Sequence, residues 1–344
     1  VAPKVEEVKP LPAAGVEEEW AFIKAAAEET NGTVSEAAMA DLNLFARRHP
    51  DSALAPEAML LLAGLKQKQG DWRPALATLL HLLYEYPADT TALRAKTAYL
   101  ELVERKASRR QRTALNDLVN LPETADKADR LSVLWQKAAE QAGETLYEPA
   151  VEEIRDFSVR FPEHKDGDKL LAALARLHGA NGKAAASLLA WRKLLALYPG
   201  SALRPQALMA VGDLYADSLR EPKQAIDAYQ ELVAKHPQAP QVLGALERTA
   251  QLFDEKLRQY GLAVEIYEKI ATTFPRTMGS LKALKAIARL QSDRLSKPEE
   301  AAKTLIRLSQ MYGGEDGVEA LYDAARIYED DLKDAAKAIE IYRE

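Results

Sequence analysis

The chain has 344 residues, 47% of them hydrophobic and 28% charged, a balance ordinary for a protein that buries a core. Its net charge of −6 offers little to a nucleic-acid phosphate backbone, so we expect no nucleic-acid partner. The absence of cysteine excludes disulfides, thiolate metal sites and cysteine nucleophiles.

Residues 1–15 contain three prolines and show no helical period. This composition predicts a disordered linker, which serves either as a tether or only as a tail. The chain begins at Val1 rather than methionine and ends at Glu344 within a helical pattern. We therefore expect further sequence on both sides, including an upstream membrane or lipid anchor. No run of about 18 apolar residues occurs, so the sequence predicts no transmembrane segment.

Residues 16–50 are predicted to form an N-terminal capping pair of helices. The first helix covers residues 16–29 and offers Trp20, Phe22 and Ile23 for burial. The second helix runs to Arg48, and Pro50 ends it. Terminal repeats need a wettable outer side, so this pair would shield the next unit from solvent.

From residue 51 to residue 344, helix-ending residues divide the chain at regular intervals. They are Pro50, Pro87, Pro122, Pro162, Pro199, Pro237 and Pro275, with Tyr312 and Gly313 in the equivalent place afterwards. Proline ends a helix because it cannot continue the hydrogen-bond ladder. The intervals of 35–40 residues predict about eight repeats in one superhelical domain, the last of them truncated.

Each repeat also carries a small residue twelve positions before its terminator and a bulky residue four positions later. The pairs are Ala75 and Leu79, Ala150 and Ile154, Ser187 and Trp191, Ala225 and Tyr229, Ala263 and Tyr267, Ala301 and Leu305, and Ala338 and Tyr342. Two helices approach closely where one side chain is small, and the bulky residue fills the groove beside it. The interval that ends at Pro122 fits worst, with Arg110 and Ala114 at these positions, so we expect irregular geometry over residues 108–143.

The stretch 201–237 shows the repeat most clearly. Its first predicted helix covers about residues 203–219, and its second runs from Pro222 to His236. The order of residues resembles the tetratricopeptide repeat (TPR), through Leu208, Gly212, Tyr215, Ala225, Tyr229 and Pro237. This resemblance implies an all-α fold, a right-handed α-solenoid of TPR-like antiparallel helix pairs, and a role in protein binding.

Two joints between repeats are similar to those of bacterial cell-envelope repeat proteins of the BamD and CpoB type. They are the segments HPDSALAPEA at 49–58 and YPGSALRPQA at 198–207. The resemblance implies a protein of the bacterial periplasm or cell envelope, and a cytoplasmic scaffold is the alternative.

The candidate binding residues follow from the same resemblance. In the TPR family the residue after the small position of the first helix faces the concave surface, which here selects Arg176, Asp213, Gln251, Arg289 and Arg326. Arginine binds carboxylates through forked hydrogen bonds, so our hypothesis is a groove that holds a protein or peptide partner of acidic character. The alternative is that these side chains pair with nearby carboxylates as ordinary helix charges.

No catalytic constellation is visible. The five histidines are far apart and are interpreted as capping or surface residues, and we predict no metal site and no cofactor. The basic run at 105–112 is interpreted as a solvated helix end, with contact to anionic lipid or an acidic protein as the alternative. The sequence therefore predicts a non-enzymatic protein-interaction scaffold. The alternative is a non-catalytic TPR arm of a larger envelope enzyme, or of a machine that processes polysaccharide or peptidoglycan.

Overall fold

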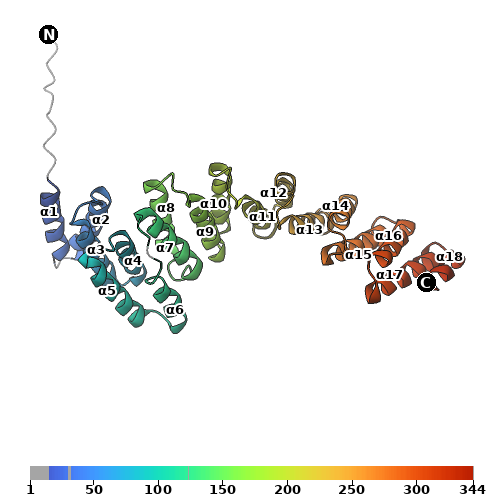
Figure 1. Ribbon diagram of the computed structural model, residues 1–344, viewed down its shortest axis with the longest axis horizontal. Coiled ribbons are helices and arrows are strands. Elements are labelled where there is room, and N and C mark those ends of the chain that lie inside the picture. Colours follow the sequence, from blue (N-terminus) through green and yellow to red (C-terminus); the bar gives the residue numbers. More distant parts are fainter. Residues whose placement is uncertain (1–14, 30–31, 123, 344) are drawn as a thin grey trace, which may run out of the picture. The chain divides into compact units, whose positions relative to one another are not determined.

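A computed structural model describes residues 15–29, 32–122 and 124–343. Within these residues the chain forms eighteen α-helices and three short π-helices, and no β-strand (Figure 1). This confirms the predicted all-α solenoid of TPR-like helix pairs. The proposed linker lies outside the described residues, except for Gly15 at the start of the first helix. The chain divides into two compact units, one ending at Lys183 and one beginning at Ala184, and we describe each by itself.

Unit 1 contains nine of these helices. They are α1 (Val16–Glu28), α2 (Gly32–Arg48), α3 (Ala55–Lys68), α4 (Trp72–Glu85), α5 (Thr90–Lys106), α6 (Arg109–Asp117), α7 (Lys127–Gln141), α8 (Tyr147–Arg160) and α9 (Gly167–Ala180). Consecutive helices pack on one another from α1 to α5. The N-terminal core joins Trp20 and Ile23 of α1 to Leu42 and Phe45 of α2 and to Leu62 of α3. These contacts bury the inner sides of the predicted capping pair.

Unit 2 contains the remaining helices. They are α10 (Ala184–Leu197), α11 (Arg204–Asp213), η1 (Leu214–Ser218), α12 (Pro222–Lys235), α13 (Val242–Gln251), η2 (Leu252–Lys256), α14 (Tyr260–Thr273), α15 (Met278–Asp293), α16 (Pro298–Met311), α17 (Gly314–Arg326), η3 (Ile327–Asp331) and α18 (Ala335–Tyr342). Each α-helix packs on the α-helix that follows it in the chain. Whether residues 51–344 act as one superhelical domain stays a prediction.

The predicted terminators mark where the second helix of a repeat stops. Six such helices end two residues before the expected proline, at Arg48, Glu85, Arg160, Leu197, Lys235 and Thr273. The residue in between still donates its backbone N–H to the helix, as Tyr198 does to the Leu194 carbonyl at 2.9 Å. Proline has no N–H with which to make the next such bond, so the ladder ends there.

The small residues of the repeat pattern all lie in helix contacts. All seven are at most 2% exposed, and of their bulky companions Leu79, Ile154, Trp191, Tyr229 and Leu305 are buried. Tyr267 is only partly buried. Tyr342 is 44% exposed because it belongs to α18, and no later helix of the described residues covers it.

Irregular geometry appears where the pattern failed. Helix α6 has only nine residues and ends at Asp117, and the described residues 118–122 and 124–126 contain no helix. Arg110 is exposed and Ala114 is only partly buried, so α6 lacks the close contact made by other second helices. Helices α7 and α8 both contact α4 instead. The weak repeat therefore lets two helices distant in sequence meet α4 directly.

Three first helices of unit 2 end in a π-helical turn. In η1 the N–H of Leu219 donates to the Leu214 carbonyl at 2.9 Å, five residues earlier, and the same bond recurs in η2 and η3. The next residue is Arg220, Arg258 or Lys333, each with a positive φ of 53–59°. A π-turn adds one residue to a helix, which accounts for part of the extra length of these repeats over the usual TPR.

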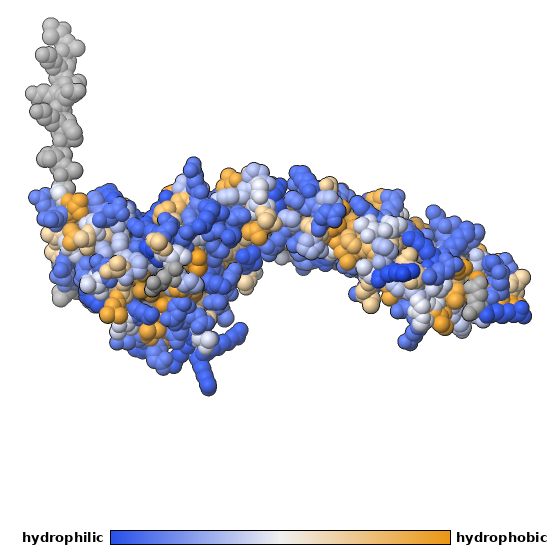
Figure 2. Space-filling model, in the orientation of Figure 1, coloured by the Kyte–Doolittle hydropathy of each residue, from blue (hydrophilic) through white to orange (hydrophobic). Residues whose placement is uncertain are grey.

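One predicted core residue is wrong. Phe22 is 73% exposed, whereas its neighbours Trp20 and Ile23 are buried. A helix advances about 100° per residue, so Phe22 lies away from the side that packs on α2. The face shown in Figure 2 is mainly hydrophilic over both units, with hydrophobic residues in small separate patches.

Candidate functional site

The five predicted groove residues occupy equivalent positions on first helices. Asp213, Gln251 and Arg326 are the last α-helical residues before η1, η2 and η3, and Arg289 lies near the end of α15. These four belong to unit 2, whereas Arg176 lies on α9 of unit 1, with its Nη2 3.8 Å from Glu140 Oε1. The structure therefore gathers four of the five in one unit.

Two arginines of unit 2 join neighbouring repeats. Arg289 Nη2 donates to Asp254 Oδ2 at 2.5 Å, from α15 to η2. Arg248 Nη2 lies 2.5 Å from both oxygens of Asp217, from α13 to η1. The Asp254 side chain is only 10% exposed, so removing its cation would leave a nearly buried carboxylate unpaired. Sequence reasoning selected Arg289 but missed Arg248 and both aspartates, because an ion-pair partner in another repeat leaves no periodic signal.

The Asp213 side chain accepts a hydrogen bond from within its own repeat. The Tyr229 hydroxyl donates to Asp213 Oδ1 at 2.7 Å, and Arg248 Nε lies 3.6 Å from the same oxygen. The Tyr229 ring fits because residue 212 is glycine. A Cβ on Gly212 would lie 2.3 Å from the ring carbon Cε1. The small residue of this repeat therefore makes room for the aromatic ring, and the ring places its hydroxyl on Asp213.

A groove between α15 and α17 has a volume of about 500 Å³. Its lining includes two of the predicted residues, Arg289 and Arg326. Its floor is apolar, made by Ala288, Leu305, Leu308, Ala320 and Ile327. Its charged lining comprises Lys285, Arg289, Arg326, Asp293, Glu319, Asp323, Asp330 and Asp331.

A second hollow of about 540 Å³ adjoins Arg289 on the side of the preceding repeat. Arg258, Arg294, Tyr260 and Glu255 line it together with the Asp254–Arg289 pair. The Arg294 guanidinium lies 5.8 Å from the centre of the Tyr260 ring, within cation–π range. Arg258 is one of the left-handed residues that follow a π-turn. The groove and this hollow thus share Arg289 as a common wall.

Unit 1 contains a buried polar network that the sequence did not reveal. His81 of α4 lies between two carboxylates: its Nδ1 is 2.5 Å from Glu153 Oε2 of α8, and its Nε2 contacts Glu85. Arg160 of α8 forms a forked pair with Glu85, with N–O distances of 2.5 and 3.1 Å. The Glu85 side chain is only 3% exposed. The network therefore joins α4 to α8 across more than seventy residues of sequence.

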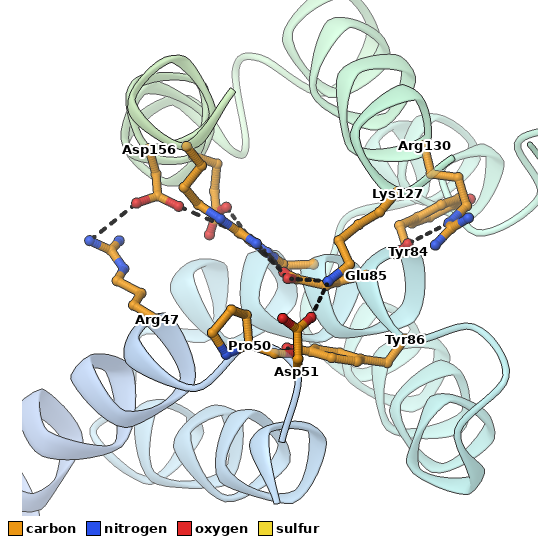
Figure 3. A network of polar contacts seen from close by, with 12 residues as sticks. Arg47, Pro50, Asp51, Tyr84, Glu85, Tyr86, Lys127, Arg130 and Asp156 are labelled. Atoms are coloured by element: carbon orange, nitrogen blue, oxygen red, sulfur yellow. Dashed lines mark hydrogen bonds and ion pairs between the residues drawn. The ribbon is translucent and has the colours of Figure 1, made fainter. Parts of the chain in front are cut away.

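Further charges surround this network, as Figure 3 shows. Lys127 Nζ lies 3.6 Å from both Glu85 Oε1 and Asp51 Oδ1, and Arg47 Nη1 lies 3.3 Å from Asp156 Oδ1. Burial opposes the charge of His81, but Glu153 and Glu85 outweigh it and raise the pKa of His81 to about 10. Burial likewise opposes ionisation of Glu85, but His81 and Arg160 lower the pKa of this carboxyl to about 2. The adjoining void is about 40 Å³, too small for a substrate.

Two histidines do not match their interpretation as capping or surface residues. His81 is 7% exposed and His178 is 4% exposed, and His178 Nδ1 lies 2.8 Å from the Tyr147 hydroxyl. His164 lies with Asp126 and Asp129 in the one group of possible metal ligands found among the described residues. The ammonium of Lys165 already pairs with one member of this group, 2.9 Å from Asp129 Oδ2.

The basic run at 105–112 is partly structural. Arg112 Nε donates to the Ala107 carbonyl at 3.1 Å and Nη2 to the Glu104 carbonyl at 2.6 Å, so this side chain caps the end of α5. Arg109 and Arg110 are exposed.

No helix in the described part of the chain is both long and apolar enough to cross a bilayer.

Comparison with known proteins identifies the repeat. A tetratricopeptide-repeat family model matches residues 57–89, which span α3 and α4, and residues 206–239, which span α11 and α12. The chain therefore contains TPR repeats, a class that generally serves as protein-interaction scaffolds. No curated protein sequence matches the chain.

Several solved TPR structures resemble the chain at low sequence identity. A tetratricopeptide repeat protein from Parabacteroides merdae is 14% identical, with 90% of this chain and 98% of that chain covered and a TM-score of 0.28. Yeast Tom70 is 13% identical, with coverages of 99% and 70% and a TM-score of 0.38. A signal-transduction ATPase with a TPR sensor from Pyrococcus horikoshii is 16% identical, with coverages of 89% and 52% and a TM-score of 0.42. All three TM-scores are low, so the repeat class rests on the family-model matches and the helix pairs described above.

Proposed function

We propose that the chain is a non-enzymatic protein-interaction scaffold that holds a segment of a partner protein along the first helices of unit 2. The observation that carries the proposal is the groove of about 500 Å³ between α15 and α17, in a chain that contains TPR repeats. The first helices of two neighbouring repeats, α15 and α17, form most of its lining, and the second helix α16 adds Leu305 and Leu308 to its floor. An extended or helical segment would bury apolar surface there without any large rearrangement.

The buried groups of unit 1 support a role without catalysis. The pKa of His81 is strongly raised, but Glu85 and Glu153 already satisfy both of its ring nitrogens. A general base needs a free nitrogen within reach of substrate. The network therefore suits the positioning of α8 on α4 rather than proton transfer.

The proposed setting is the bacterial cell envelope or periplasm, with an anchor upstream of the linker. It is supported by the two repeat joints at 49–58 and 198–207 and by the proline-rich start of the chain. A non-catalytic arm of a larger envelope enzyme, or of a machine that processes polysaccharide or peptidoglycan, is the second candidate. The sequence beyond Glu344 distinguishes them, because a catalytic domain there would favour the arm. A cytoplasmic scaffold is the third candidate, favoured by a gene start that encodes no export signal.

The groove is tested by filling it without changing its charge. Ser292 lines the groove and is only partly buried, so Ser292→Trp would obstruct it. Ala234 is exposed on α12 and does not line the groove, so Ala234→Trp is the matched control. Proteins captured from an extract by the unmodified chain are purified and titrated against all three forms by calorimetry.

The expected result is that Ser292→Trp abolishes measurable binding of the purified partner while Ala234→Trp leaves its Kd unchanged. Equal affinity for all three forms would refute the groove as the binding site. Turnover of a substrate by this chain alone would refute the absence of catalysis.

A further inference from the structure

The charges of the groove between α15 and α17 are not balanced. Its lining has three basic and five acidic side chains. Lys285 Nζ is held by Asp316 at 2.8 Å and by Glu319 at 3.0 Å, and Arg289 is held by Asp254 outside the groove. Two of the three cations are therefore already neutralised by close carboxylates.

The remaining acids leave negative charge exposed. Arg326 Nε lies 3.9 Å from Asp330 Oδ2, which pairs these two weakly. Asp293, Asp323 and Asp331 are exposed and make no ion pair or side-chain hydrogen bond with any other described residue. Three carboxylates without a cation thus line the same groove as its apolar floor of Ala288, Leu305, Leu308, Ala320 and Ile327.

We propose that the occupant of this groove is a protein segment that inserts a lysine or arginine side chain between Asp293, Asp323 and Asp331. Long basic side chains lay an aliphatic stem on apolar surface and keep the charged head among polar groups, which is the arrangement that this floor and rim offer. This inference rests on the proposed protein-binding function. It differs from the acidic partner expected from Arg289 and Arg326, because an acidic segment would have to displace the Asp254 carboxylate and meet the three aspartates.

The test selects peptides from a random library, so the natural partner need not be identified beforehand. A phage library of random twelve-residue peptides is panned on the full chain and, separately, on the variant Asp293→Asn/Asp323→Asn/Asp331→Asn. All three positions are exposed, so asparagine there leaves the helices intact. The control Asp227→Asn/Glu265→Gln/Glu315→Gln removes the same charge from exposed, unpaired positions that do not line the groove. The strongest peptide is then synthesised and titrated by fluorescence anisotropy at low and high salt.

The expected result is that peptides with lysine or arginine beside apolar residues are enriched on the unmodified chain and not on the triple-aspartate variant, and that the control binds the synthetic peptide as tightly as the unmodified chain does. The triple-aspartate variant should bind the synthetic peptide at least about 10-fold more weakly, which is the loss expected for charge-assisted hydrogen bonds. High salt should weaken binding to the unmodified chain as well.

Two other outcomes overturn different statements. Enrichment of acidic peptides, or equal affinity of the synthetic peptide for all three forms, would overturn the basic partner and leave the scaffold function in place. Failure of every peptide to enrich above a control surface would overturn the proposed groove itself.

Discussion

The contact between Tyr229 and Gly212 predicts that Gly212→Ala destabilises the unmodified chain but stabilises a variant that lacks the Tyr229 ring. A Cβ added at residue 212 would lie 2.3–2.7 Å from three atoms of the Tyr229 ring. This is far inside normal contact distance, and Tyr229 is fully buried and cannot move away freely. We expect Gly212→Ala to destabilise the unmodified chain by about 1–3 kcal/mol, the usual cost of overpacking a core.

The same change should stabilise the chain once the ring is gone. Tyr229→Ala removes a buried aromatic side chain and should itself cost about 3–5 kcal/mol. In that background the three ring atoms nearest to a methyl group at residue 212 are absent, and alanine is about 1 kcal/mol better than glycine inside a helix. Gly212→Ala should therefore raise the free energy of unfolding of Tyr229→Ala by up to about 1 kcal/mol.

Hydrogen exchange across α11 and α12, together with urea unfolding followed by circular dichroism, measures these free energies. The local measurement is needed because stacked repeats can unfold in stages. Tyr229→Phe is the control, since it keeps the ring and loses only the hydroxyl donated to Asp213 at 2.7 Å. Gly212→Ala should cost the same in that variant as in the unmodified chain. A cost of the same sign and size in the Tyr229→Ala background would refute the steric argument.

Three further outcomes follow from the structure. The raised pKa of His81, about 10 against 6.5 unfolded, gives stability that is complete below pH 6.5 and is lost as the pH rises through 10. The lowered pKa of Glu85, about 2 against 4.5 unfolded, gives stability that is present above pH 4.5 and is lost as the pH falls through 2. The melting temperature of unit 1 should therefore be highest at about pH 4.5–6.5. In the variant His81→Gln the melting temperature should fall less steeply at alkaline pH. Arg258→Gly should raise the free energy of unfolding by up to about 1 kcal/mol in a urea titration, because glycine adopts its φ of 53° without strain; a loss of stability would show that the arginine side chain outweighs the strain. Phe22→Ser should leave the melting temperature within about 1 °C, whereas Trp20→Ala should lower it by several degrees, and equal shifts would contradict their different burial.

Much of the fold could be predicted because its signals are local. Proline lacks a backbone N–H in any surroundings, so Pro87 and Pro199 each predict the end of a helix without reference to any other residue. The small residue and its bulky companion lie on one helix at a spacing of four, so Ala225 and Tyr229 mark a packing face before the neighbouring helix is known. Where that local signal was missing, around Arg110, the regular stack was missing too.

The π-turns show where local signals were present but not interpreted. They share the pattern of an aliphatic residue, an aromatic residue and, five positions after the first, leucine followed by a basic residue, as in LYADSLR at 214–220. The turn was not predicted because the left-handed residue that follows it is usually glycine, whereas here it is Arg220, Arg258 or Lys333.

The amino-acid order alone determined the helices, the approximate length of each repeat and the faces that pack, since these depend on residues within one turn or one hairpin of each other. Only the tertiary structure decided which charged side chains form ion pairs with one another. Asp254 meets Arg289, and Glu85 meets Arg160, across 35 and 75 residues, and such pairings depend on which helices lie side by side and on the direction of each side chain. The same contacts leave Asp293, Asp323 and Asp331 unpaired in the groove, because Coulomb attraction is satisfied between neighbours in space and not between neighbours in the chain.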